Sequence, residues 1–190
     1  MPGAGRMKAF PKLKRTDWFG VVTPIRPPAL TAGKPVVVGH DPLMGNESPD
    51  AVVFSPHGAT GYAIYPGTNT IVLFRTATGR AGRPIRVGYY PLGAVVTPDG
   101  RWVYLSEATG VAAIRTSTRT VTRIKAGPGP LVPLYDGASV IGLSPDGKTV
   151  YALNYRVSAS GTVTPISVAT SRPGKPITVG VNPVTMIIVR

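Results

Sequence analysis

The chain contains no cysteine and no long apolar run. Without cysteine there can be no disulfide framework, no thiolate zinc site and no cysteine nucleophile, and the redox compartment stays undecided. A membrane-spanning helix needs about 20 mostly apolar residues, and no segment approaches this length. The basic residues near the start are not followed by the apolar core of a signal peptide. We therefore expect no transmembrane segment and no signal peptide in this chain, and the sequence assigns no compartment.

Acidic residues are scarce, because 8 Asp and Glu face 21 Lys and Arg, for a formal net charge of +13. Such a charge attracts nucleic acid, anionic lipid or acidic glycans, and it serves equally as a solubility device. Glycine and proline are plentiful, at 23 and 21 residues, and they are spread between apolar runs. This pattern favours many short strands joined by turns, in a chain of 190 residues that can form one sizeable core.

The chain is internally repetitive. Residues 22–42 align without a gap to residues 163–183 and share Val-Thr-Pro-Ile, Gly-Lys-Pro and Val-Gly-x-x-Pro. Residues 71–91 align to the same segment, and a shorter copy covers 111–130. Each copy after the first is preceded by an apolar run, a turn of the Pro-Asp-Gly type and an aromatic strand. Each unit therefore indicates four short strands, which we name A to D, and such units every 40–50 residues or so are predicted to be β-propeller blades.

These motifs resemble the YVTN-type β-propeller repeat, a bacterial, actinobacterial-like family, over residues 19–190. The resemblance implies a propeller fold. It implies no single activity, because the family includes lactonase-like and surface-antigen-like propellers, often exported or surface-associated. The family normally has an aspartate after the strand C aliphatic residue. Here that position holds Arg26, Arg75, Arg115 and Ser167, so part of the basicity belongs to the repeat itself.

We predict an all-β fold of four-stranded antiparallel blades. The expected parts are a basic N-terminal segment or degenerate strand at 1–18, full blades at 43–88, 91–127 and 130–180, and a composite blade of 19–39 plus 183–190. The composite blade would close a small ring by placing residues 184–189 beside 19–25. The alternative is an open partial propeller, for which self-association is expected.

Ligands of such folds usually bind on the face formed by the D-to-A and B-to-C connections, so polar departures from the repeat there are ligand-binding candidates. They are His40, Asp41, Glu47, Asp50, Glu107, Tyr135, Asp136, Asn154, Tyr155 and Arg156. These residue types suit a hard divalent cation or acid and base catalysis of lactone hydrolysis. Their spacing matches no metal motif, so solvated loop polarity is the default expectation, with no metal and no cofactor. Asp99 and Asp146 recur in the A–B turns and are predicted to build them.

Cations concentrate on strands C and D, where the alternation points them outward. Charges on an edge strand discourage edge-to-edge pairing, and protection of the blade edges is the favoured interpretation of these cations. The alternative is a polyanion-binding rim, with Arg75, Arg83, Arg86, Arg115, Arg123 and Lys125 as candidates. A single-stranded nucleic acid would also need aromatic residues among the cations, and only Tyr89 and Tyr90 follow arginines in this way.

The first functional hypothesis is a non-catalytic propeller module that binds a protein, peptide or polyanion of unknown identity, or serves as a scaffold. A second hypothesis is a lactonase-like hydrolase that uses the acidic loop residues. A third is binding of nucleic acid or another polyanion through the basic rim, whose affinity would fall steeply with salt. The sequence does not decide whether the protein is an enzyme, and it favours a non-catalytic role.

Overall fold

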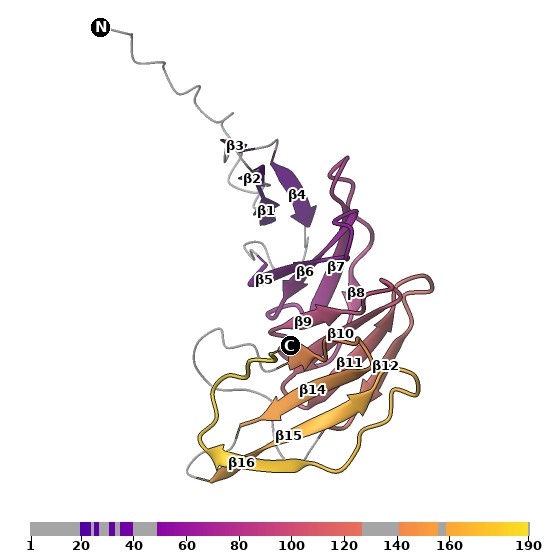
Figure 1. Ribbon diagram of the computed structural model, residues 1–190. Helices are drawn as coiled ribbons and strands as arrows, with labels where there is room; N and C mark the ends of the chain where they lie inside the picture. Colours follow the sequence, from indigo (N-terminus) through magenta and orange to yellow (C-terminus); the bar gives the residue numbers. More distant parts are fainter. Residues whose placement is uncertain are drawn as a thin grey trace, which may run out of the picture.

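The computed structural model describes residues 20–23, 25–26, 31–32, 35–39, 49–126, 141–155 and 159–189. Three antiparallel sheets of four strands dominate this part of the chain (Figure 1). None of it forms a helix long and apolar enough to cross a membrane. The predicted all-β fold of four-stranded antiparallel blades is confirmed.

In each blade, strands that follow one another in sequence also pair with one another. The first blade contains β5 (Ala51–Phe54), β6 (Thr60–Tyr65), β7 (Thr70–Arg75) and β8 (Ile85–Arg86). The second contains β9 (Ala94–Val96), β10 (Trp102–Glu107), β11 (Gly110–Arg115) and β12 (Val121–Ile124). The third contains β13 (Ile141–Leu143), β14 (Thr149–Asn154), β15 (Ser160–Ser167) and β16 (Ile177–Val181). Because β9 contacts both β5 and β13, the A strands of the three blades lie next to one another, as they do around a propeller axis.

The N-terminal strands repeat the C–D hairpin of a blade. They are β1 (Gly20–Val22), β2 (Ile25–Arg26), β3 (Thr31–Ala32) and β4 (Val36–Gly39). Strand β1 pairs with β4 so that Val22 faces Val36. In the first blade Ile71 faces Ile85 in the same register. The segment therefore supplies strands C and D of a blade that precedes the first full one.

The blades pack face to face through apolar side chains that alternate along each B strand. In β6, Tyr62 and Ile64 belong to the core shared by the first and second blades. Ala63 and Tyr65 point the other way and pack with Val36 of the N-terminal hairpin. A B strand is thus buried on both faces, which is why its sequence is almost continuously apolar.

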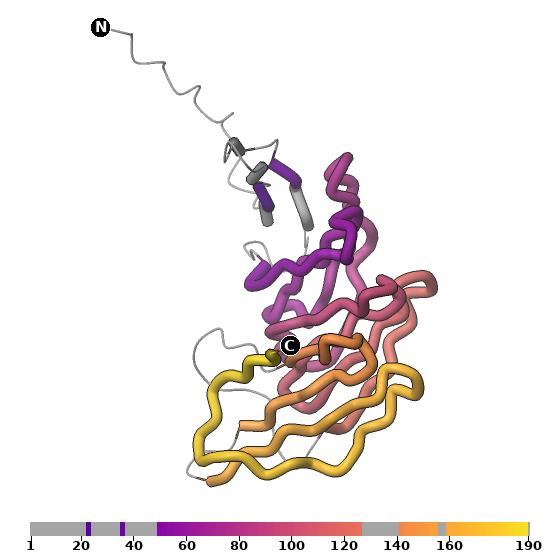
Figure 2. The backbone as a smooth tube through the Cα atoms, viewed as in Figure 1, coloured from indigo at the N-terminus to yellow at the C-terminus, as the bar shows by residue number. Residues whose placement is uncertain are grey.

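The C-terminal tail, residues 184–189, runs back over the third blade (Figure 2). It has no strand assignment, while β1 pairs with β4. A Cβ atom added to Gly142 of β13 would lie 2.7 Å from Ile188 Cδ1 and 3.3 Å from Met186 Cε, so both side chains lie against that strand. Ile187 and Val189 are 83% and 79% exposed. Within the described residues the tail therefore packs on the third blade and does not pair with the N-terminal strands, an arrangement consistent with the open partial propeller.

The contact between the tail and the third blade predicts different effects at neighbouring positions. We expect Ile188→Ser to lower the free energy of unfolding by about 1 kcal/mol, because a half-buried aliphatic side chain loses its contact with β13. Ile187→Ser should change it by less than about 0.5 kcal/mol, because that side chain faces solvent. Urea denaturation of both variants measures this difference. Equal effects would contradict the packing of the tail.

Candidate anion-binding site

Every blade has two ends. The A–B and C–D hairpins lie at the turn end, and the B–C hairpins and D-to-A connections lie at the connection end. In the first blade Thr60 pairs with Arg75 at the turn end, and Tyr65 pairs with Thr70 at the connection end. The loops in which the sequence predicted a ligand site belong to the connection end.

The A–B hairpins at the turn end are held by aspartates. Asp99 Oδ1 accepts hydrogen bonds from the Thr97 hydroxyl, at 2.5 Å, and from the Arg101 amide, at 3.0 Å. Asp146 accepts the equivalent two bonds in the third blade, at 2.6 and 3.0 Å. The hydroxyl bond first, and then the amide bond, hold the pKa of each carboxyl below its ordinary value. The predicted turn role of both aspartates is confirmed.

The C–D hairpins at the turn end contact the blade that comes before them. Gly79, Arg119 and Ser171 occupy the same turn position, each with φ between 53° and 69°. The Ser171 hydroxyl lies 3.2 Å from the Tyr104 hydroxyl of the second blade. A Cβ atom added to Gly82 of the first blade would lie 2.8 Å from Arg119 Nη2. Arg119 therefore carries a positive charge from the second blade onto the first.

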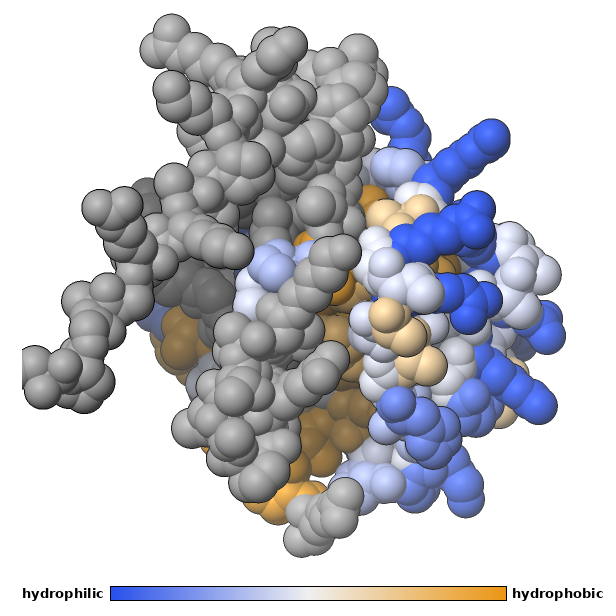
Figure 3. Space-filling view, turned by 90° about the horizontal axis from the view of Figure 1, so that it is seen from above, coloured by the Kyte–Doolittle hydropathy of each residue, from blue (hydrophilic) through white to orange (hydrophobic). Residues whose placement is uncertain are grey.

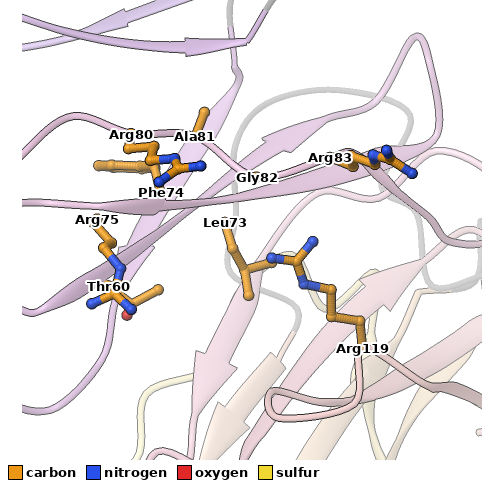
Figure 4. A pocket seen from close by; sticks show the side chains of 9 residues that line it. All are labelled: Thr60, Leu73, Phe74, Arg75, Arg80, Ala81, Gly82, Arg83 and Arg119. Carbon is orange, nitrogen blue, oxygen red and sulfur yellow. The ribbon is translucent and has the colours of Figure 1, made fainter.

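A hollow of about 560 Å³ opens at the turn end where these two blades meet. It is lined by Thr60, Leu73, Phe74, Arg75, Arg80, Ala81, Gly82, Arg83 and Arg119, and we call it the arginine hollow. Figure 4 shows Arg80 beside Phe74 and Arg119 reaching from the second blade toward the edge of the first. The hollow thus gathers cations from two blades.

One residue difference between blades explains where the hollow opens. Trp102 begins β10 and pairs with Arg115, whose Cζ lies 5.7 Å from the centroid of the indole. In the first blade Thr60 has the place of the tryptophan, and it pairs with Arg75. The small threonine provides no ring under Arg75, so the space stays open. In the third blade the residue in the arginine position is Ser167, which has no charge.

The electrostatics of the hollow are those of a site for an anion. Its four arginines are exposed, and its lining contains no acidic residue. The ion pair seen in the described part of the chain joins Arg101 to Asp99, outside the hollow. Figure 3 shows hydrophilic side chains gathered along one side of the molecule. Because like charges around one space repel, a bound anion would lower their energy.

The connection end holds a buried carboxylate. Glu107 ends β10, is 3% exposed, and its Oε1 accepts a hydrogen bond of 2.5 Å from the Gly88 amide. Next to it, Arg123 Nη2 donates to the Val87 carbonyl at 3.4 Å. Burial raises the pKa of Glu107, while the Gly88 bond and the charge of Arg123 act in the opposite direction. Glu107 therefore fastens the second blade to the connection that comes from the first.

Asn154 fastens the third blade to the connection that comes from the second blade. It ends β14, as Glu107 ends β10, and is fully buried. Its Nδ2 donates to the Ala126 carbonyl at 2.5 Å, and the Thr164 hydroxyl donates to its Oδ1 at 3.2 Å. Two predicted ligand residues thus have structural partners at separate blade junctions, and their ligand role stays a prediction.

The other predicted ligand residues of the loops are mostly not described. His40, Asp41, Glu47, Tyr135, Asp136 and Arg156 lie outside the described residues. Asp50 is exposed just before β5, and Tyr155 is half-buried after β14. In the described ranges no group of three or more metal-ligating side chains comes together.

The six predicted polyanion-binding residues separate in space. Arg75 and Arg83 line the hollow, whereas Arg115 packs on Trp102 and Arg123 is held near Val87. Arg86 and Lys125 are exposed elsewhere. The candidates predicted from the sequence did not include Arg80 and Arg119, which complete the hollow. The signal for Arg119 was its alignment with Gly79 of the first blade, because a large cation in a turn glycine's position must project from the surface.

The buried Glu107 predicts a pH effect on stability. Its raised pKa means that the folded state binds the proton more tightly than the unfolded state, whose pKa is near 4.5. The contribution of protonated Glu107 to the stability of the fold is therefore complete below that pH, and it is lost as the pH rises through the folded pKa. We expect Glu107→Gln, an uncharged mimic, to gain stability relative to the parent between pH 4.5 and 7, by about 2–4 °C in Tm.

Asp99→Asn is the matched control for this measurement. The pKa of Asp99 is lowered in the folded state, so its ionised carboxylate stabilises the fold above the unfolded pKa, and this stabilisation is lost as the pH falls. Asp99→Asn should therefore lower the stability at pH 7 and lower it less at pH 3. Thermal melts of both variants and the parent across this range give the two slopes. A Tm difference for Glu107→Gln that does not change with pH would contradict the prediction.

Comparison with known proteins rests on structure, since no family model and no curated protein matches the chain. Hydrazine synthase of Kuenenia stuttgartiensis superposes with a TM-score of 0.66 at 21% identity, over 84% of this chain and 43% of that one. The periplasmic gluconolactonase of Pseudomonas aeruginosa gives 0.58 at 23% identity, over 86% and 51%. The WD40 repeats of RRP9 give 0.51 at 12% identity, over 66% and 37%. The fold is a β-propeller.

These similarities establish the propeller fold and nothing finer, because every identity is below 25%. The chain spans about half or less of the length of each of these proteins. The activities of these proteins are therefore not transferred to this chain, and its function must be argued from its own residues.

Proposed function

We propose that this propeller is a non-catalytic binding module of the YVTN type, and that it binds an anionic macromolecule through the arginine hollow. The observation that carries the proposal is that Arg75, Arg80, Arg83 and Arg119 line one hollow whose lining contains no acidic residue. The excess of 21 cationic over 8 acidic side chains adds long-range attraction for such a partner.

The position of the aromatic residues favours a polypeptide that carries anionic groups over a single-stranded nucleic acid. Tyr89 and Tyr90 are 65% and 41% exposed. They lie at the connection end, where the Ala108 amide donates to the Tyr89 carbonyl at 2.8 Å. The hollow lies at the turn end, so bases stacked on these rings would not bring their phosphates to its arginines.

A lactonase-like hydrolase is the second candidate, supported by the gluconolactonase among the structural neighbours. The described acids favour binding over catalysis, because Asp99 and Asp146 build turns and Glu107 holds a blade junction. The enzyme hypothesis is tested by lactone hydrolysis with the purified protein and with the variant Glu47→Gln/Asp50→Asn. Turnover that this variant loses would support the enzyme and contradict our proposal.

Retention on immobilised heparin, a polyanion of high charge density, tests the binding proposal. We expect the parent to elute at high salt and Arg75→Glu/Arg83→Glu to elute much earlier, with the slope of log affinity against log salt reduced by about 2. Arg172→Glu/Lys175→Glu makes the same change of net charge on the third blade and is the matched control. Equal shifts for the two double variants would show that net charge alone causes retention, and would overturn the proposal.

A further inference from the structure

We propose that the arginine hollow is a binding site for a phosphate monoester group. This inference deepens the proposed function and rests on it, because it names the group that an anionic partner would place between the two blades. Four guanidinium groups, the Thr60 side chain and the edge of Phe74 line one space (Figure 4).

The charge and the geometry of the donors favour a phosphoryl group over a carboxylate. A phosphate monoester carries about −1.5 to −2 charges at pH 7 and three strong acceptor oxygens, whereas a carboxylate has one charge and two oxygens. Guanidinium groups bind phosphate through paired N–H donors. Three arginines of the hollow come from the first blade and Arg119 from the second, so donors approach from more than one side.

The size and the walls of the hollow favour an ester over free phosphate. Sites for small organic ligands have volumes of roughly 300–1,000 Å³, and the arginine hollow, at about 560 Å³, is within this range. Leu73 is half-buried and lines the hollow beside the arginines. The group that carries the phosphate can lie against the Leu73 side chain while the guanidinium groups hold the oxygens.

The turn conformation of Arg119 and its approach to Gly82 make a test variant available. Its φ of 61° is a conformation that glycine adopts more readily, and Gly79 has φ 69° at the same turn position. Gly82 has no side chain where Arg119 crosses to the first blade, and a Cβ atom there would lie 3.3 Å from the guanidinium carbon. Arg119→Gly therefore removes one guanidinium group while suiting the turn, which makes it a test variant that should fold.

Titration calorimetry with O-phosphoserine tests the inference. We expect measurable binding of O-phosphoserine, and no binding of serine or acetate at the same concentrations. Arg119→Gly should weaken binding about tenfold or more, because a hydrogen bond from a charged donor is lost. Thr60→Trp should weaken it at least as much, since it fills the hollow with the ring that lies beneath Arg115 in the second blade. Arg172→Ala, outside the hollow, should change the dissociation constant less than twofold.

The outcomes separate this inference from the proposed function. Absence of O-phosphoserine binding, equal binding of acetate, or an unchanged dissociation constant in both hollow variants would overturn the phosphate site. If heparin retention still depends on Arg75 and Arg83 in that case, the binding module stands without it. If retention is indifferent to these arginines while O-phosphoserine binds, the site stands and the macromolecular function fails. Inorganic phosphate binding as tightly as O-phosphoserine would overturn the preference for an ester.

Discussion

Gly61→Val is expected to lower the free energy of unfolding by about 3 kcal/mol. Gly61 is buried in β6 and pairs with Phe74 of β7. The Phe74 ring occupies the space where a Cβ atom of Gly61 would be, and three of its carbon atoms lie within contact of that position. Phe74 is 2% exposed and packs edge-to-face with Phe54, with the ring centroids 6.2 Å apart. A branched side chain at Gly61 must therefore displace a ring that has little room to move.

The other two blades fill the space between strands B and C with a different pair of side chains, and this pair suggests a compensating substitution at Phe74. In the second blade the equivalent pair is Val103 with Ile114, and in the third it is Val150 with Ile166. We expect Gly61→Val/Phe74→Ile to be more stable than Gly61→Val alone, because the pair then matches its repeats. The coupling free energy from a double-mutant cycle in urea should be about 1 kcal/mol or more. Additive effects of the two substitutions would show that the pair does not compensate in volume.

Asn154→Asp is expected to destabilise the protein by about 3–5 kcal/mol at pH 7. The Asn154 amide donates to the Ala126 carbonyl at 2.5 Å inside a fully buried junction. An ionised carboxylate there has no proton to donate, so two acceptor oxygens would face each other out of contact with water. The loss should be smaller at low pH, where the carboxyl regains a proton. Guanidinium denaturation at pH 7 and pH 4 measures both effects.

Asn69→Asp is the matched control, since it makes the same chemical change where only an acceptor is needed. Asn69 Oδ1 accepts a hydrogen bond from the Tyr90 amide at 2.7 Å in an exposed turn, and an aspartate retains that acceptor. We expect a change of less than about 0.5 kcal/mol. Equal destabilisation by the two variants would mean that the Asn154 bond does not hold the second and third blades together.

The fold was predictable because its signals are local. Alternation of apolar residues along each strand and the Pro-Asp-Gly turns recur at matching positions, and the strands pair in the register that the repeats indicate, as Val22 with Val36 and Ile71 with Ile85 do. Polarity in the loops was a weaker signal. Glu107 and Asn154 are residue types that ligand sites use, yet both are buried at blade junctions. A polar side chain at the end of a B strand can also form hydrogen bonds with the backbone of the preceding connection.

Propeller blades with basic outward strands were predictable from the sequence alone, because pattern and charge are properties of short segments. Where the cations meet depends on the packing of the blades. Thr60 and Arg119 are far apart in sequence and belong to different blades, and they line one hollow because the second blade packs its C–D turn onto the first. Contacts between blades depend on the angle and spacing of packed sheets, which no single repeat encodes.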